Sequence, residues 1–333
     1  MDIAANLKSK KRTWLITGVA GFIGSNIASF LIKNGQRVVG VDNFITGSKK
    51  NLKEFSKDKL KNFKFYEGDI TNENFCDKVC KNVEIVLHQA ALGSVPRSIE
   101  NPLKTNLHNV NGFLNILFYA KKHEVKKFIY ASSSSVYGDS AILPKKEINL
   151  GSPLSPYAAT KRFNEIYSDI FKKVYDFDTV GLRYFNVFGK NQNPKGAYAA
   201  VIPKWLDAIE NNKNINIYGN GNTSRDFCYI KNVVSANILA GLQDKKKIKN
   251  KLYNISCGSK ISLKNLFKEM TKLYSIRGLN YKKKVTYLPF RSGDIYHSQA
   301  DISLAKKDLN YIPMYDVRKG LKELIFERFK NLK

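Results

Sequence analysis

The stretch Thr13-Trp-Leu-Ile-Thr-Gly-Val-Ala-Gly-Phe-Ile-Gly24 is an apolar segment that leads into three glycines, Gly18, Gly21 and Gly24. It predicts a strand, a tight turn and the start of a helix. In such a turn the first glycine permits the sharp change of direction, the second lets the backbone approach a pyrophosphate, and the third lets the helix pack closely on the sheet. The pyrophosphate lies at the helix N-terminus. The spacing therefore predicts a dinucleotide-binding site.

The next predicted strand indicates which dinucleotide is bound. Arg37-Val-Val-Gly-Val41 ends at Asp42, about 20 residues after the glycines, where a carboxylate holds a ribose 2′-hydroxyl. The same carboxylate repels a 2′-phosphate, so the sequence favours NAD over NADP. The alternative is an ordinary α/β turn followed by an unrelated aspartate.

Length and composition limit the class of protein. A chain of 333 residues is long enough for one large domain or two closely joined ones. The polar, basic start of the chain and the lack of any apolar run of membrane-spanning length predict a soluble, cytoplasmic protein without a membrane partner. The cysteines have no metal-ligand spacing, so we expect reduced, mostly buried thiols and no metal site.

The formal net charge of +28 raises the possibility of nucleic-acid binding. The excess is mostly lysine spread along the chain, its local runs are short, and no recognisable nucleic-acid module surrounds them. We therefore expect no nucleic-acid partner. A positive field of this kind would still attract an anionic nucleotide substrate.

Alternating apolar strands and amphipathic helices in the first half predict βαβ units around a parallel sheet. The fold class is therefore α/β, with a Rossmann-type doubly wound parallel sheet and a smaller C-terminal α/β substrate domain. We expect the NAD-binding domain at 11–185, with a returning segment at about 224–256, and a second, substrate-binding domain at 186–223 and 257–333. Strands are expected near 14–17, 38–41, 63–67, 85–89, 128–131 and 179–184, and a loop-rich segment at 186–196.

The helix expected after Pro156 carries apolar residues at helical spacing, which predicts a buried face. That face consists of Phe163, Ile166, Tyr167, Ile170, Phe171 and Val174.

The same helix carries Tyr157 and Lys161 one turn apart, and serines at 132–135 follow a predicted strand. A phenol is a poor base at its ordinary pKa of about 10. A nearby ammonium and the positive nicotinamide of the oxidised cofactor favour the phenolate, while a serine hydroxyl can bridge the tyrosine and a substrate alcohol. By itself Tyr-x-x-x-Lys is commonly a surface lysine beside a packed aromatic ring. After a dinucleotide turn and a serine-tipped strand, it predicts a proton-transfer site.

With these features the chain resembles the extended short-chain dehydrogenase/reductase superfamily over nearly its whole length. The motifs that carry the resemblance are Thr17-Gly-Val-Ala-Gly-Phe-Ile-Gly24, Val41-Asp-Asn-Phe44, Gly68-Asp69, His88-Gln-Ala-Ala91, Ser133-Ser-Ser-Val-Tyr-Gly138, Ser155-Pro-Tyr-Ala-Ala-Thr-Lys161, Leu182-Arg-Tyr-Phe-Asn-Val-Phe-Gly189 and Ser224-Arg-Asp-Phe-Cys-Tyr-Ile230. Segments 90–98, 196–205 and 291–301 resemble the C4-epimerases that act on UDP-N-acetylglucosamine or its uronic acid in surface-polysaccharide synthesis.

The resemblance implies a site as well as a reaction. A hydride leaves C4 of the sugar for NAD and returns to the other face of a 4-keto intermediate, with Ser133, Tyr157 and Lys161 as the catalytic residues. The cofactor positions implied are Gly18, Gly21, Phe22, Ile23, Gly24, Asp42, Asn43, Asp69, Ile70, Gln89, Ala90, Ala91, His108, Tyr157, Lys161 and Tyr184. The substrate positions implied are Gly93, Ser94, Ser133, Ser134, Ser135, Tyr157, Asn186, Gln192, Ala200, Val201, Lys204, Tyr218, Arg225, Arg291, Asp294 and Ser298.

Departures from related enzymes narrow the activity. Gly93 and His108 stand where hexose epimerases carry a lysine and an asparagine, which argues against a simple UDP-galactose epimerase. Ser134 and Ser135 stand where dehydratases carry an Asp-Glu pair, so dehydration loses its acid and base. A UDP-glucuronate-type epimerase or decarboxylase, with Arg97 facing a carboxylate, is the alternative enzyme. A non-catalytic NAD- or RNA-binding protein is the alternative of another class.

The resemblance also implies a homodimer. The two subunits would pair through the helices near 102–121 and 156–175, which would pool into a four-helix bundle.

Overall fold

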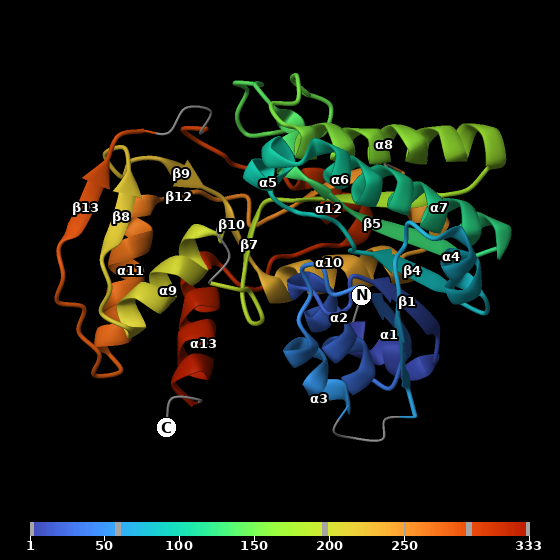
Figure 1. Cartoon of the computed structure of the whole chain (residues 1–333), viewed down its shortest axis with the longest axis horizontal. Helices are drawn as coiled ribbons and strands as arrows, with labels where there is room; N and C mark the ends of the chain where they lie inside the picture. Colours follow the sequence, from blue (N-terminus) through green and yellow to red (C-terminus); the bar gives the residue numbers. More distant parts are fainter. Residues whose placement is uncertain (1–2, 57–60, 195–198, 250, 291–294, 331–333) are drawn as a thin grey trace.

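The computed structural model describes residues 3–56, 61–194, 199–249, 251–290 and 295–330, and these residues form a seven-stranded parallel sheet with smaller sheets beside it (Figure 1). The strand order is β11-β6-β5-β4-β1-β2-β3. The strands are β1 (Thr13–Thr17), β2 (Arg37–Asp42), β3 (Phe63–Glu67), β4 (Ile85–His88), β5 (Lys127–Ser133), β6 (Thr179–Tyr184) and β11 (Leu252–Ile255). The predicted doubly wound fold is confirmed. The order reverses between β1 and β4, and ligands bind beyond the strand ends at such a point.

Helices cover both faces of this sheet. On one face α4 (Glu73–Cys80), α7 (Gly112–Lys122) and α8 (Pro156–Tyr175) enclose a core that contains Phe113, Phe128 and Phe171. On the other face α2 (Phe22–Lys33) and α10 (Ile230–Leu242) pack on Trp14 and Ile16. The remaining helices of this half are α1 (Ile3–Ser9), α3 (Lys53–Ser56), α5 (Val95–Glu100) and α6 (Pro102–Asn106), with short 3₁₀ or π turns at Lys49–Leu52, Leu107–Asn111, Ser134–Tyr137 and Lys245–Lys247.

Short strand pairs and three of the remaining helices of the described chain build the smaller part, seen at the left of Figure 1. The pairs are β7 (Asn186–Phe188) with β10 (Phe227–Tyr229), β9 (Ser224–Arg225) with β12 (Ile261–Ser262), and β8 (Ile215–Tyr218) with β13 (Val285–Leu288). The helices are α9 (Val201–Glu210), α11 (Leu263–Ser275) and α13 (Val317–Lys330). Helix α12 (Ser303–Leu309) instead packs on β11 and α10, beside the main sheet. The expected loop at 186–196 therefore begins with a strand, because β7 pairs with a segment about 40 residues further along the chain.

The prediction for the apolar face of α8 is largely wrong. The helix exists, and the Ser155 hydroxyl caps its first turn. However, Phe163, Ile166, Ile170 and Val174 have exposed fractions of 50%, 41%, 41% and 64%, and only Phe171 of the predicted face is buried. The buried side of α8 instead carries mostly polar or small residues, which are Ala158, Thr160, Lys161, Asn164, Glu165 and Ser168. Helical periodicity identified an apolar stripe, but the fold points that stripe outwards.

Two further observations concern the whole described chain. None of its helices is both long enough and apolar enough to cross a bilayer, and it contains no group of three or more His, Cys, Asp or Glu side chains that could hold a metal ion. Its cysteines are free thiols, of which Cys76, Cys80 and Cys228 are buried and Cys257 is partly buried.

Candidate active site

A cavity of about 380 Å³ lies beyond the carboxyl ends of β1, β2 and β4. Most residues predicted to contact the cofactor line it, namely Gly18, Gly21, Phe22, Ile23, Gly24, Asp42, Asn43, Ile70, Gln89, Ala90, Ala91 and His108. Gly93 and Ser94, predicted to contact the substrate, line the same cavity. The structure thus brings together residues from both predicted sets.

The glycine turn fits a dinucleotide. Gly18 has φ +68°, and a Cβ on it would lie 2.9 Å from the Ala90 Cα. A Cβ on Gly24 would lie 2.2 Å from the Gly18 carbonyl oxygen, so α2 can approach β1 only because residue 24 is glycine. Gly21 precedes α2, and no side chain caps that helix. The amide groups of its first turn are therefore available for a phosphate.

Asp42 is buried at the end of β2, where its carboxylate accepts hydrogen bonds from the Ala20 and Phe44 amides at 2.9 and 2.8 Å. Burial raises the pKa of Asp42, and these backbone hydrogen bonds oppose the rise. Asp69 lies outside the lining but supports it, because its carboxylate accepts from Asn43 Nδ2 at 2.8 Å and lies 3.6 Å from His108 Nδ1.

Replacing Asp42 with asparagine should weaken discrimination against NADP. The amide keeps one of the two oxygens that accept from the Ala20 and Phe44 amides, so one backbone hydrogen bond is lost, and the side chain no longer repels a 2′-phosphate. Since like charges in contact cost several kcal/mol, we expect the NAD-to-NADP affinity ratio to fall roughly 10- to 100-fold. Mass spectrometry of the copurified cofactor and titration of both dinucleotides measure this. Bound NADP in the unaltered protein would contradict the assignment.

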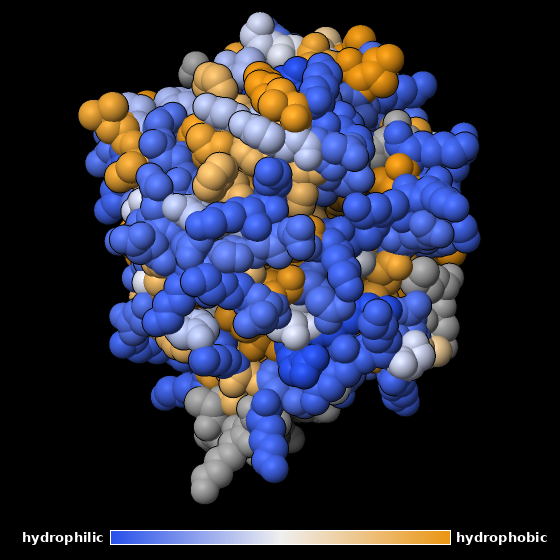
Figure 2. Space-filling view, turned by 90° about the vertical axis from the view of Figure 1, so that its right-hand side faces the viewer, coloured by the Kyte–Doolittle hydropathy of each residue, from blue (hydrophilic) through white to orange (hydrophobic). Residues whose placement is uncertain are grey.

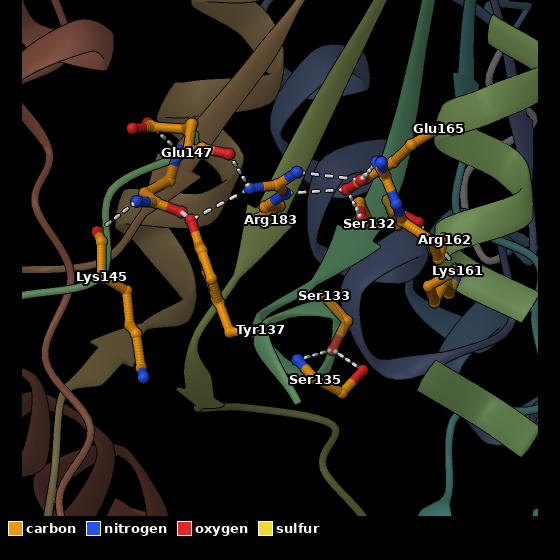
Figure 3. A network of polar contacts seen from close by, with 12 residues as sticks. Ser132, Ser133, Ser135, Tyr137, Lys145, Glu147, Lys161, Arg162, Glu165 and Arg183 are labelled. Carbon is orange, nitrogen blue, oxygen red and sulfur yellow. Dashed lines mark hydrogen bonds and ion pairs between the residues drawn. The ribbon is translucent and has the colours of Figure 1, made fainter. Parts of the chain in front are cut away.

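Ser133, Tyr157 and Lys161 come from adjacent elements. Ser133 ends β5, and its Oγ accepts hydrogen bonds from the Ser135 amide and hydroxyl at 3.1 and 3.0 Å (Figure 3). Tyr157 lies in the first turn of α8, within hydrogen-bonding reach of the Ser133 side chain. Lys161 is buried, and its ammonium donates to the Ala131 carbonyl oxygen at 2.8 Å. The expected proton-transfer group is therefore assembled where β5 meets α8.

The charge state of this group differs from the simple expectation. Burial raises the pKa of Tyr157, and the Ser133 hydrogen bond only partly opposes it. Burial lowers the pKa of Lys161 to about 8, against the charge of Glu165, which raises it. The Lys161 ammonium is desolvated and directed at a backbone carbonyl, so a lowering of the Tyr157 pKa by its charge stays a prediction for the protein with bound cofactor.

A buried ion pair between Arg183 and Glu165 lies one helical turn from Lys161. Glu165, one turn further along α8, accepts from Arg183 Nε and Nη2 at 2.8 and 2.9 Å, and both side chains are essentially inaccessible to solvent (Figure 3). Ser132 Oγ donates to the same carboxylate at 2.7 Å. On its other side Arg183 donates to Tyr137 Oη, which in turn donates to Asn254. This network ties α8 to β5, β6 and β11.

His88, at the end of β4, is fully enclosed behind the cavity. Its Nδ1 lies 3.0 Å from Thr17 Oγ1, and its ring packs on Phe113 and Phe128. Burial, followed by the charge of Lys161, lowers the pKa of His88 from 6.5 to about 3. The folded protein therefore holds His88 neutral where the unfolded chain would protonate it.

This difference predicts acid sensitivity. Between the two pKa values the unfolded chain binds a proton at residue 88 and the folded protein does not. The free energy of unfolding therefore has its full value above pH 6.5 and decreases as the pH falls below it. From pH 6.5 to 5 the free energy of unfolding should drop ~2 kcal/mol more than in a His88→Asn variant. Urea denaturation of both proteins across this range tests it. Parallel curves would show that His88 does not titrate as described.

A second cavity, of about 420 Å³, lies in the smaller part of the molecule. The predicted substrate residues Asn186, Ala200, Val201, Lys204, Tyr218 and Arg225 line it. Ala199 lines both cavities, so the two meet there.

Some predicted residues lie apart from these two linings. Gln192 Nε2 donates to the Val187 carbonyl oxygen at 3.2 Å. Ser298 is buried, and its backbone amide donates to the Ser224 carbonyl oxygen. Tyr184 Oη accepts from Asn237 at 2.8 Å and donates to the Gln89 side chain. Arg291 and Asp294 lie outside the described residues.

The structure adds residues that sequence reasoning missed. Ile45, Thr46, Asn193 and Ala199 also line the cavities, and Asn237 holds Gln89 and Tyr184. Glu165 had a local signal, because it follows Lys161 by one helical turn. Asn237 had none, since it reaches Gln89 from a helix far along the chain.

Comparison with known proteins agrees with this site. The profile of the NAD dependent epimerase/dehydratase family matches residues 14–256. The UDP-glucuronate 4-epimerase of Thermodesulfobacterium geofontis is 36% identical over 318 residues, covering 94% of each chain.

Solved structures are similar over the same length. The UDP-N-acetylglucosamine 4-epimerase of Methanobrevibacter ruminantium M1, in complex with UDP-N-acetylmuramic acid, superposes with a TM-score of 0.88 at 36% identity over 97% of this chain and 99% of that one. The UDP-glucose 4-epimerase of Thermotoga maritima superposes with a TM-score of 0.88 at 33% identity, over 96% of this chain and 100% of that one. By its sequence, its fold and its dinucleotide cavity, the chain belongs to the NAD dependent epimerase/dehydratase family.

Proposed function

We propose that this protein is an NAD-dependent C4-epimerase of UDP-N-acetylhexosamines or the corresponding uronic acids. The observation that carries the proposal is the grouping of Ser133, Tyr157 and Lys161 where β5 meets α8. Strand β5 lies next to β4, whose carboxyl end borders the dinucleotide cavity. The similarity to UDP-sugar 4-epimerases supports the reaction and the UDP group.

The residues suggest how the reaction proceeds. When bound, NAD supplies a hydride acceptor and donor, and its positive oxidised ring favours the Tyr157 phenolate. Tyr157 Oη removes the proton of the sugar 4-hydroxyl and later returns it to the 4-keto oxygen. Ser133 Oγ orients that oxygen, because it lies within reach of Tyr157 and is itself held by Ser135. The reaction has no net redox change.

Substrate binding divides between the two cavities. Lys204 and Arg225 line the second cavity, where they suit a diphosphate that prefers charged donors. Asn186, Ala200, Val201 and Tyr218 complete that lining around the proposed UDP moiety. With the diphosphate held there, the 4-keto sugar can turn over in the space next to Ser133, Ser134 and Ser135.

The choice of sugar requires a direct assay. Purified protein should equilibrate its sugar without added cofactor, and product analysis should compare UDP-N-acetylglucosamine, its uronic acid, UDP-glucose and UDP-glucuronate. Turnover of an N-acetylated sugar at C4 supports the proposal, and no epimerisation of any of them contradicts it. A UDP-glucuronate epimerase is the second candidate, favoured by the similarity to the Thermodesulfobacterium geofontis enzyme.

Ser298 is proposed to leave room for the N-acetyl group. It is 9% exposed and held by the Ser224 carbonyl, beside the Arg225 that we place at the diphosphate. Ser298→Tyr should lower kcat/KM for UDP-N-acetylglucosamine at least about 10-fold, because the tyrosine ring would overlap with the N-acetyl group and such overlap is destabilising. The variant should spare UDP-glucose, which has no N-acetyl group. Equal kcat/KM ratios for the two sugars in both proteins would refute this role.

We further infer a homodimer. Apolar side chains exposed on α6 to α8 include Leu103, Leu107, Phe118, Phe163, Ile166, Ile170 and Val174. Figure 2 shows hydrophobic side chains gathered at the top, where α8 lies in Figure 1. Exposed apolar side chains on neighbouring helices are typical of an interface, and sedimentation velocity tests this inference.

We also propose two domains, one formed by residues 11–185 and 224–256 and the other by residues 186–223 and 257–333. A role in surface-polysaccharide synthesis is a further proposal. The place of β11 and α10 in the main sheet layer supports the returning segment.

A further inference from the structure

Arg97 has a distinctive position in the first cavity. It lies on α5, and its amide donates to Ser94 Oγ at 3.3 Å, so that Ser94 caps the helix. It lines the cavity together with Gly93 and Ser94, the positions after β4. Helix α5 packs on α8, the helix of Tyr157 and Lys161 (Figure 1). Arg97 therefore lies on a helix that packs directly on the helix of Tyr157 and Lys161.

The charge of Arg97 has no carboxylate partner in the part of the chain that the structure describes. Among the described residues no carboxylate lies within 4.0 Å of its guanidinium. Asp42 is the carboxylate among the described lining residues, and it already accepts two backbone hydrogen bonds at the end of β2. Arg97 is also the only lysine or arginine among those lining residues. A guanidinium in such a cavity is a good partner for a carboxylate or phosphate of a bound molecule.

Other groups account for the phosphates. The amides of the glycine turn and of the first turn of α2, which no side chain caps, would hold the cofactor pyrophosphate. Lys204 and Arg225 line the second cavity, which we assign to the UDP diphosphate. Arg97 lines only the first cavity, so it remains available for an anionic group that neither diphosphate provides.

We propose that Arg97 binds a carboxylate at C6 of the sugar, and that the substrate is a UDP-N-acetylhexosaminuronate. This inference rests on the proposed epimerase function and specifies the substrate of that same site. Arg97 is a specificity-determining residue, since it takes no part in the proton or hydride transfer. The planar guanidinium can hold a carboxylate through two parallel hydrogen bonds, which a neutral hydroxymethyl group cannot form.

The test compares kcat/KM for UDP-N-acetylglucosaminuronate and UDP-N-acetylglucosamine in four proteins. These are the unaltered enzyme, Arg97→Gln, Arg97→Lys and a control, Arg37→Gln. Arg37 is exposed at the amino end of β2, whereas the cavity lies beyond the carboxyl ends of the strands, so its loss removes the same charge without touching the cavity. The unaltered enzyme should prefer the uronate. Because hydrogen bonds to charged groups are strong, Arg97→Gln should reduce that preference about 10- to 100-fold, mainly through KM for the uronate.

The lysine variant should retain part of the preference, and the Arg37 control should retain all of it. An unchanged preference in Arg97→Gln would overturn the proposal, as would loss of copurified NAD, which would place Arg97 at the cofactor. If the unaltered enzyme epimerises UDP-N-acetylglucosamine but not the uronate, the carboxylate proposal fails while the epimerase function stands. If it epimerises neither sugar, both fail.

Discussion

Tyr157→Phe is expected to reduce epimerase activity by a factor of roughly 10²–10⁴, the usual contribution of a general acid-base group. The variant keeps the ring in the first turn of α8 and removes only the hydroxyl that faces Ser133. The proton of the sugar 4-hydroxyl then has no acceptor at the right position. The content of bound NAD and the circular dichroism spectrum should not change.

Tyr175→Phe is the matched control, because Tyr175 ends the same helix with 47% of its surface exposed. Its loss of a hydroxyl should leave the rate unaltered. Steady-state rates with the preferred UDP-sugar and with bound NAD quantified for each protein separate catalysis from folding. A Tyr157→Phe enzyme with full activity would assign the proton transfer to another group.

Arg183→Met is expected to cost about 3–5 kcal/mol of unfolding free energy, the usual effect of removing one partner of a buried ion pair. Glu165 would lose two hydrogen bonds, at 2.8 and 2.9 Å, in a position that water does not reach. Arg162 would still contact it at 3.1 Å, but from a partly exposed position. Tyr137 would lose a donor as well. Urea denaturation measures the loss.

Two controls distinguish this effect from simple disruption. Glu165→Met combined with Arg183→Met should recover much of the stability, because a buried pair replaced by apolar side chains is often neutral or better. Lys173→Ala breaks an exposed pair with Asp169 and should cost under about 1 kcal/mol. If Arg183→Met costs no more than Lys173→Ala, the buried network does not stabilise the fold as described.

Local sequence patterns determined the features that depend on neighbouring residues. The spacing of Gly18, Gly21 and Gly24 requires a close turn whatever the rest of the chain does, and the structure shows that a Cβ at Gly24 would collide with the turn itself. Asp42 follows its strand directly, and Tyr157 and Lys161 share a face because a helix repeats every 3.6 residues. These patterns were sufficient for the fold class and for the catalytic candidates.

Tertiary structure decided which surfaces meet. The apolar stripe of α8 was visible in the sequence, yet periodicity cannot say whether a stripe faces the core or the exterior, and the fold leaves Phe163 and Val174 exposed. The Glu165 and Arg183 pair exists because β6 lies beside β5 under α8. The lone charge of Arg97 could be recognised only after the cavity and its neighbours were placed. Burial and pairing depend on contacts between distant segments, and a local pattern does not encode them.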